Sequence, residues 1–264
     1  MIRYLTLIRA FMRASIQEEA AYRANFFISL LHSALNFGAG LLGLVVLFEQ
    51  VEAVRGWDFG GALAVLGVYL TVSALRGLFI SPSLDALAGM DGEVWQGTLD
   101  FTLLRPVDVQ FLASVRRWRV FALFDLLLGL GVLLAALITM RHALTPGQIA
   151  AFVVALGAAL TTLYAVLLAF TGLVFWSPGF LFTWVFDGVF QMARYPVGVY
   201  PGWLRLVLTW IVPVGVITTV PAQALTGDLP PGLLPGSVIF ALALVFGASW
   251  VFRNGLRRYA SASS

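Results

Sequence analysis

Few side chains in this chain could act as nucleophiles, proton carriers or metal ligands. The 264 residues include no cysteine and only two histidines, so neither a thiolate nucleophile nor a histidine cluster for a metal ion is available. The HExxH motif of zinc proteases and the GxSxG motif of serine hydrolases are also absent. His32, Asp125 and Asp187 lie in apolar surroundings but far apart in the sequence. An enzyme acting on a lipid or lipid-linked substrate is therefore kept only as the alternative interpretation.

The basic residues argue against two further classes of protein. All 16 of them are arginine. A P-loop requires a lysine after its glycines, so this chain cannot form one, and we expect it to bind no cofactor itself. The net charge is +3 and the isoelectric point is about 9.6. Because the arginines flank apolar segments instead of forming a separate basic face, no nucleic-acid partner is expected.

The composition is that of a membrane protein. Sixty per cent of the residues are hydrophobic and 11% are charged, whereas soluble domains carry about 25% charged residues. A bilayer core of about 30 Å is spanned by roughly 20 apolar helical residues. The sequence predicts an all-α polytopic fold in which residues 1–264 form a single transmembrane domain. Its six expected transmembrane helices cover residues 24–48, 59–80, 120–140, 149–175, 204–220 and 236–252.

One more apolar run, residues 180–193, leaves five, six or seven spans compatible with hydropathy alone. Cytoplasmic loops carry an excess of arginine. With six spans only Arg55 and Arg141 lie outside, whereas a seventh crossing by 180–193 would also move Arg194 and the C-terminal arginines outward. We therefore predict cytoplasmic termini and an interfacial helix at 180–193 on the inner surface. The Pro- and Gly-rich residues 221–236 are expected to form an outer connection.

Residues 1–23 have an amphipathic pattern. Arg9 and Arg13 recur at helical spacing, while Ile8 and Met12 occupy another face. This pattern predicts a helix that lies on the membrane surface.

The first span carries a polar face. Ser29, His32 and Asn36 share one side of the predicted helix, which is compatible either with a translocation path or with close helix packing. Asp125 in the third span would cost about 2.5 to 3.5 kcal/mol near the bilayer centre. It therefore needs a partner such as Arg76, in a structural ion pair or a proton relay.

The longest polar interval, residues 81–119, contains 5 of the 13 acidic residues and is predicted to be cytoplasmic. A solvated connector is one interpretation. However, the interval also contains apolar side chains, among them Phe101 and Leu104, which should pack against the bundle or a partner.

The run Glu93–Pro106, which reads EVWQGTLDFTLLRP, resembles the cytoplasmic signature of ABC type-2 exporter permeases. Other runs resemble one bacterial subfamily of these permeases at matching positions along the chain. They are Ala21–Phe26, Ala193–Pro196, Ile211–Pro213, Val220–Ala222 and Gly255–Tyr259.

This resemblance implies a six-span permease with an interfacial elbow helix at 1–23, in the bacterial cytoplasmic membrane. It also implies a second copy or a related permease, and two separate ATP-binding subunits that bind ATP and Mg²⁺. A coupling helix in the 81–119 loop would contact those subunits. The residues expected to serve coupling are Glu93, Gly97, Asp100, Leu104, Arg105 and Pro106. Many relatives carry two half-membrane helices before the last span, which the proline-rich segment here is not expected to form. The sequence does not indicate the substrate.

Overall fold

The structure, a computed structural model, describes residues 2–21, 23–140, 144–177 and 182–259. Within these ranges the chain is helical, with no β-strand. Five described helices are long and apolar enough to cross a membrane, and one bent pair of shorter helices passes the same test together. The predicted all-α polytopic fold is confirmed.

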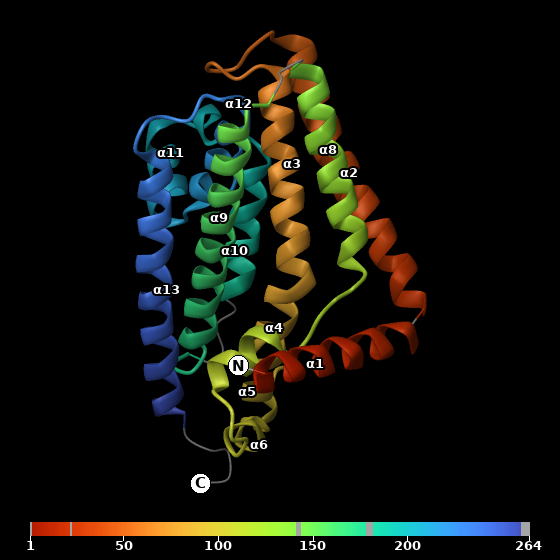
Figure 1. Ribbon diagram of the computed structural model, residues 1–264, viewed down its shortest axis with the longest axis vertical. Helices are drawn as coiled ribbons and strands as arrows, with labels where there is room; N and C mark the ends of the chain where they lie inside the picture. The colour runs from red at the N-terminus through yellow and green to blue at the C-terminus, as the bar shows by residue number, and fades with distance from the viewer. Residues whose placement is uncertain (1, 22, 141–143, 178–181, 260–264) are drawn as a thin grey trace.

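The long helices stand side by side and define two ends of the bundle (Figure 1). We call the end with the α2–α3 turn (residues 51–58) the hairpin end. The opposite end is the elbow end, because α1 (Ile2–Ala21) lies across it as a separate helix. The long helices are α2 (Arg23–Gln50), α3 (Phe59–Leu75), α8 (Ala122–Met140), α9 (Pro146–Leu173) and α13 (Leu233–Arg258).

Helix α3 lies at the centre of the bundle, with almost every residue buried. It packs against α8 through two glycines. A Cβ atom on Gly129 would lie 2.6 Å from the backbone nitrogen of Thr71, and one on Gly67 would lie 2.9 Å from that of Leu133. The two backbones are therefore in direct contact, as small residues allow between membrane helices. Beyond α3, one π-helical turn, η1 (Arg76–Ile80), continues the chain toward the elbow end.

Residues 182–200 run through the bundle from the elbow end to the hairpin end, as α10 (Phe182–Phe190), η2 (Gln191–Arg194) and η3 (Val197–Val199). Phe182 stacks on Phe170 near the elbow end of α9, with 5.9 Å between ring centroids. Phe190 lies 5.3 Å from Tyr69, midway along α3. At the hairpin end, Arg55 donates a hydrogen bond of 2.9 Å to the Tyr200 carbonyl. The prediction of an inner-surface helix at 180–193 is therefore wrong for residues 182–193; residues 180 and 181 lie outside the described residues.

Pairing inside the bundle explains this difference. Arg194 donates a hydrogen bond to the side-chain oxygen of Asn36 on α2. Its guanidinium also lies 5.5 Å from the centroid of the Tyr69 ring, a favourable cation–π arrangement. An arginine with such partners can be carried within a membrane bundle, whereas the count of arginines per loop assumes that each remains in water.

The predicted span 204–220 is also wrong, because this part of the chain folds back. Helix α11 (Gly202–Leu206) and η4 (Val207–Ile211) are followed by a bend of 79° into η5 (Gly215–Thr219) and α12 (Val220–Thr226). Pro213 lies at the bend and has no backbone N–H to continue a helix.

Both ends of this segment lie at the hairpin end. The segment 202–226 begins just after Tyr200, which lies at the hairpin end. Near its other end, the Leu225 carbonyl accepts a hydrogen bond of 3.5 Å from Gln148, which lies at the hairpin end of α9. Residues 202–226 are therefore a re-entrant pair of helices, and the expectation that the chain lacks such a pair is wrong. Arg205 accordingly lies at the hairpin end; Arg141 is outside the described residues.

Besides the five long helices, the segment 182–200 also passes from one end of the bundle to the other. The chain therefore traverses the bundle six times within the described residues, and both described ends lie at the elbow end (Figure 1).

The close contact of α3 and α8 predicts that Gly129→Leu destabilises the fold, by about 1 to 3 kcal/mol, because the new side chain must force the two backbones apart. The measurement is thermal unfolding in detergent. Gly131→Leu is the matched control on the same helix, since a Cβ there meets nothing within 4 Å. Equal melting temperatures for the two variants would contradict the α3–α8 contact.

Candidate functional site

Residues 81–119 form a compact unit of short helices at the elbow end, which we call the α4–α7 module. Asp108 begins the last of these helices by accepting the backbone N–H of Phe111 at 2.9 Å. Gly97 ends α5 in the left-handed conformation, with φ of 65°, which glycine adopts without steric cost. The helices are α4 (Ser81–Ala88), α5 (Glu93–Gln96), α6 (Leu99–Leu103) and α7 (Val109–Val115).

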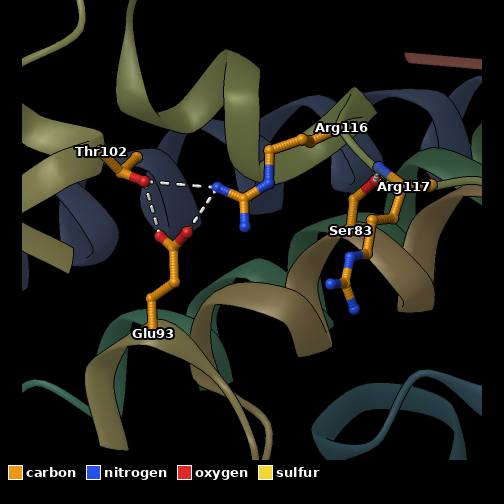
Figure 2. A network of polar contacts seen from close by, with 5 residues as sticks. All are labelled: Ser83, Glu93, Thr102, Arg116 and Arg117. Atoms are coloured by element: carbon orange, nitrogen blue, oxygen red, sulfur yellow. Dashed lines mark hydrogen bonds and ion pairs between the residues drawn. The ribbon is translucent and has the colours of Figure 1, made fainter. Parts of the chain in front are cut away.

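A triangle of polar side chains holds the module together (Figure 2). Glu93 forms an ion pair of 2.7 Å with Arg116 and accepts a hydrogen bond of 2.7 Å from the Thr102 hydroxyl. Arg116 also donates to Thr102 at 3.3 Å. Both charged side chains are only 17% exposed. The predicted coupling residue Glu93 is thus engaged within the module, joining α5, α6 and the residue after α7. The sequence analysis did not identify Thr102 or Arg116, since nothing in their spacing shows which carboxylate they face.

Hydrogen bonds tie the module to two long helices. The Ser114 hydroxyl lies 2.7 Å from the Tyr164 hydroxyl of α9. Gln110 donates to the Ser249 hydroxyl of α13 at 2.9 Å. Helix α7 is therefore fixed to both α9 and α13.

The residues that follow α7 connect this helix to α4 within the module, and they connect the module to the elbow helix α1. The Ser83 hydroxyl donates to the Arg117 carbonyl at 2.8 Å and accepts the Arg117 N–H at 2.9 Å (Figure 2). On α1, the Glu19 carboxylate accepts the Val120 N–H at 2.8 Å. Burial raises the pKa of this carboxyl, although hydrogen bonds from two backbone amides oppose the shift.

The far side of the module is an exposed apolar surface. Leu104 is 81% exposed and Phe101 is 70% exposed, and Leu103 beside them is also exposed. We call these three residues the apolar tip. The predicted coupling residues Arg105 and Pro106 follow directly and are exposed too. Asp100 is half-buried; together with burial, its carboxylate raises the pKa of Tyr259 just beyond α13.

A polar cavity of about 560 Å³ lies between α2, α3, α8 and α10. Of the predicted path residues, His32, Asn36 and Asp125 line it together. Ser29 does not; it lines a separate crevice of about 400 Å³ beside α1. The charged residues lining the polar cavity are Arg76, Arg119, Arg194, Asp85, Asp125 and Asp187.

An ion pair lies at the wall of this cavity, but not the expected one. Arg76 pairs with Asp187 of α10 at 2.5 Å, not with Asp125. Its Nε donates to the Ser81 hydroxyl at 2.9 Å, and its guanidinium lies 5.8 Å from the ring centroids of Phe186 and Phe190. The sequence analysis missed this pair because it placed Asp187 on the membrane surface.

The cavity combines equal numbers of arginines and aspartates with amide and hydroxyl groups, so it can surround a polar molecule. Among the described residues, no group of three or more histidines, aspartates or glutamates is arranged to hold a metal ion.

The ion pair predicts different effects for two aspartates of the same cavity. Asp187→Asn should lower the stability of the purified protein by at least about 1 kcal/mol, because a charged hydrogen bond contributes about 1.5 to 3 kcal/mol and this one is partly exposed. Asp125→Asn, the matched control, should leave the unfolding temperature unchanged. A larger loss of stability from Asp125→Asn would contradict the assignment of Arg76 to Asp187.

Comparison with known protein families gives a match over most of the chain. A family model described as ABC-2 family transporter protein matches residues 34–263. No curated protein and no solved structure matched the chain. The matched region includes five of the six crossings completely, α2 from residue 34 onward, and the whole α4–α7 module. The chain therefore belongs to the ABC-2 family of membrane transporter proteins.

Proposed function

We propose that this chain is the permease subunit of an ATP-driven exporter in a bacterial cytoplasmic membrane, coupled to separate ATP-binding subunits through the α4–α7 module. The observation that carries the proposal is the apolar tip, which is exposed to water on a module bound firmly to the membrane helices. Exposed apolar patches of this kind mark interaction sites. ATP and Mg²⁺ would be bound by the partner.

The distribution of arginines supports a cytoplasmic elbow end, because cytoplasmic segments carry the excess of positive charge. Among the described residues, the hairpin end carries Arg55 and Arg205. The elbow end carries more, in the module and in the last turns of α13: Arg105, Arg116, Arg117, Arg119, Arg253, Arg257 and Arg258.

In this proposal the apolar tip enters a cleft of the ATP-binding subunit. Leu104 and Phe101 provide the apolar contact, and Arg105 with Pro106 forms its polar edge. The other three predicted coupling residues position the apolar tip and do not contact the partner themselves. Glu93 fixes α5 against α6, and Gly97 permits the turn between these helices. Asp100 lies toward the end of α13.

Movement of the tip would reach the membrane helices through defined contacts. Helix α7 is bonded to α9 and α13 through Tyr164 and Ser249. Helix α4 continues directly from η1, whose Arg76 holds α10 through Asp187. A push on the module is therefore transmitted to α3, α9, α10 and α13 together.

A second permease, either another copy or a related chain, would cover the exposed side of α2. Phe27, Ile28, Leu31 and Leu35 of this helix are largely exposed, and α2 borders the polar cavity. Two permeases and two ATP-binding subunits would then enclose a path for the substrate.

The apolar tip predicts that Phe101→Asp combined with Leu104→Asp releases the ATP-binding subunits. Removing an interface hot spot costs about 2 kcal/mol or more, which is roughly 30-fold in affinity. Co-purification with the ATP-binding subunit and ATP-dependent transport should both be lost, while insertion into the membrane is retained. The control is Leu104→Met, which keeps the apolar contact. Full co-purification of the double variant would refute docking at the tip.

The Glu93–Arg116 pair predicts a charge-swap result. Glu93→Arg and Arg116→Glu each place two like charges side by side. A complex that carries either single variant should therefore still hydrolyse ATP in its ATP-binding subunits but should not transport. The double variant restores an ion pair and should recover part of the transport. A double variant no better than either single change would show that Glu93 acts as a direct contact and not by positioning the module.

A further inference from the structure

A large cavity lies at the hairpin end, between the re-entrant pair and the start of α13. Its volume is about 850 Å³, within the range of about 300 to 1,000 Å³ typical of ligand sites. In Figure 1, α11, α12 and the first turns of α13 surround this region at the end opposite α1. The cavity exists because residues 202–226 fold back instead of crossing.

The walls of this cavity are mainly apolar and aromatic. Trp57, Trp210 and Phe240 line it together with Val216 and Val220. Trp210 of the re-entrant pair packs edge-on against Phe240 of α13, with ring centroids 6.3 Å apart. Phe240 lies seven residues beyond Leu233, so the cavity extends roughly 10 Å along α13 at 1.5 Å per residue. This depth suits an extended hydrocarbon chain.

One side of the cavity is open to an apolar surface. Leu206 and Trp210 line the cavity and are also largely exposed. Their exposed neighbours Trp203 and Ile211, and Ile239 on α13, are apolar as well. In a membrane protein such a surface faces lipid rather than water, so a membrane lipid can enter from the side.

The cavity carries a single kind of charge. Among the described residues that line it, Arg205 is the one charged side chain. It belongs to α11, directly after the segment that reaches the hairpin end. A guanidinium at the membrane boundary pairs well with a phosphate. Gln223 and Thr209 add polar groups to the same wall.

We propose that this cavity binds an anionic phospholipid of the leaflet at the hairpin end, with its phosphate on Arg205 and one acyl chain along the aromatic wall that Trp210 and Phe240 form. The bound lipid would fill the space that the re-entrant pair leaves and would hold this pair against α13. This site is separate from the polar cavity and from the α4–α7 module, and it does not depend on export.

The test uses the purified full-length protein in detergent, without ATP, and titrates phosphatidylglycerol and phosphatidylcholine of identical acyl chains by native mass spectrometry. We expect the protein to prefer phosphatidylglycerol. Arg205→Gln should weaken binding of phosphatidylglycerol by about tenfold and that of phosphatidylcholine less, because the choline cation of this lipid already neutralises its phosphate, so the preference for phosphatidylglycerol should fall. Unaltered preference in this variant would overturn the role of Arg205.

A second pair of variants tests the cavity itself. Gly236 lines it, and a Cβ there meets nothing within 4 Å, so Gly236→Trp can fill the space without a clash. It should weaken binding of both lipids by about tenfold. Gly247→Trp, on the same helix and equally open but outside the cavity, is the matched control. Equal lipid binding by the two variants would overturn the proposal. Because no nucleotide or substrate is involved, the result is independent of whether the chain exports anything.

Discussion

The architecture depends on one constraint: an arginine inside a membrane bundle must have partners. Arg76 and Arg194 meet this constraint with Asp187 on α10 and with Asn36 and Tyr69 on the neighbouring helices. These contacts bind residues 182–200 to α2 and α3 and draw the segment through the bundle. Once this segment has crossed, the following residues begin at the hairpin end. The bend of 79° at Pro213 then turns residues 202–226 back to the same end.

Much of the fold was predictable because five helices are long apolar runs, and such runs have few alternatives in lipid. The fifth crossing, residues 182–200, was not predictable in this way. Residues 204–220 are more apolar than 180–193, yet Pro213 interrupts them, whereas 182–200 contain Asp187 and Arg194. Hydropathy and arginine counts treat each charge as if it were alone. Neither method can detect an ion pair whose two residues lie more than 100 positions apart in the sequence, as Arg76 and Asp187 do.

The candidate sites also contain some features that the sequence indicated and others that it did not. The apolar tip was visible as apolar residues within a polar interval, but the sequence left open whether Leu104 packs against the bundle or against a partner. Its exposure became clear only from the fold. The direction of the Glu93 side chain was not visible, because a carboxylate near the start of a short helix is usually solvated. Its burial depends on Arg116, which the fold brings to it from the other end of the module. His32, Asn36 and Asp125 meet in one cavity only because α2 and α8 both border α3.

The two ends of the bundle are held together by different kinds of contact. At the elbow end, polar side chains join short helices to one another and to α9 and α13, and directional hydrogen bonds resist bending, so the module moves as a unit. At the hairpin end, the re-entrant pair meets α13 across a cavity with apolar walls, and apolar contacts have no fixed direction. Sliding there breaks few hydrogen bonds. In the proposed function, a force applied at the module would therefore pass through these hydrogen bonds, and the cavity between the re-entrant pair and α13 would leave room for movement.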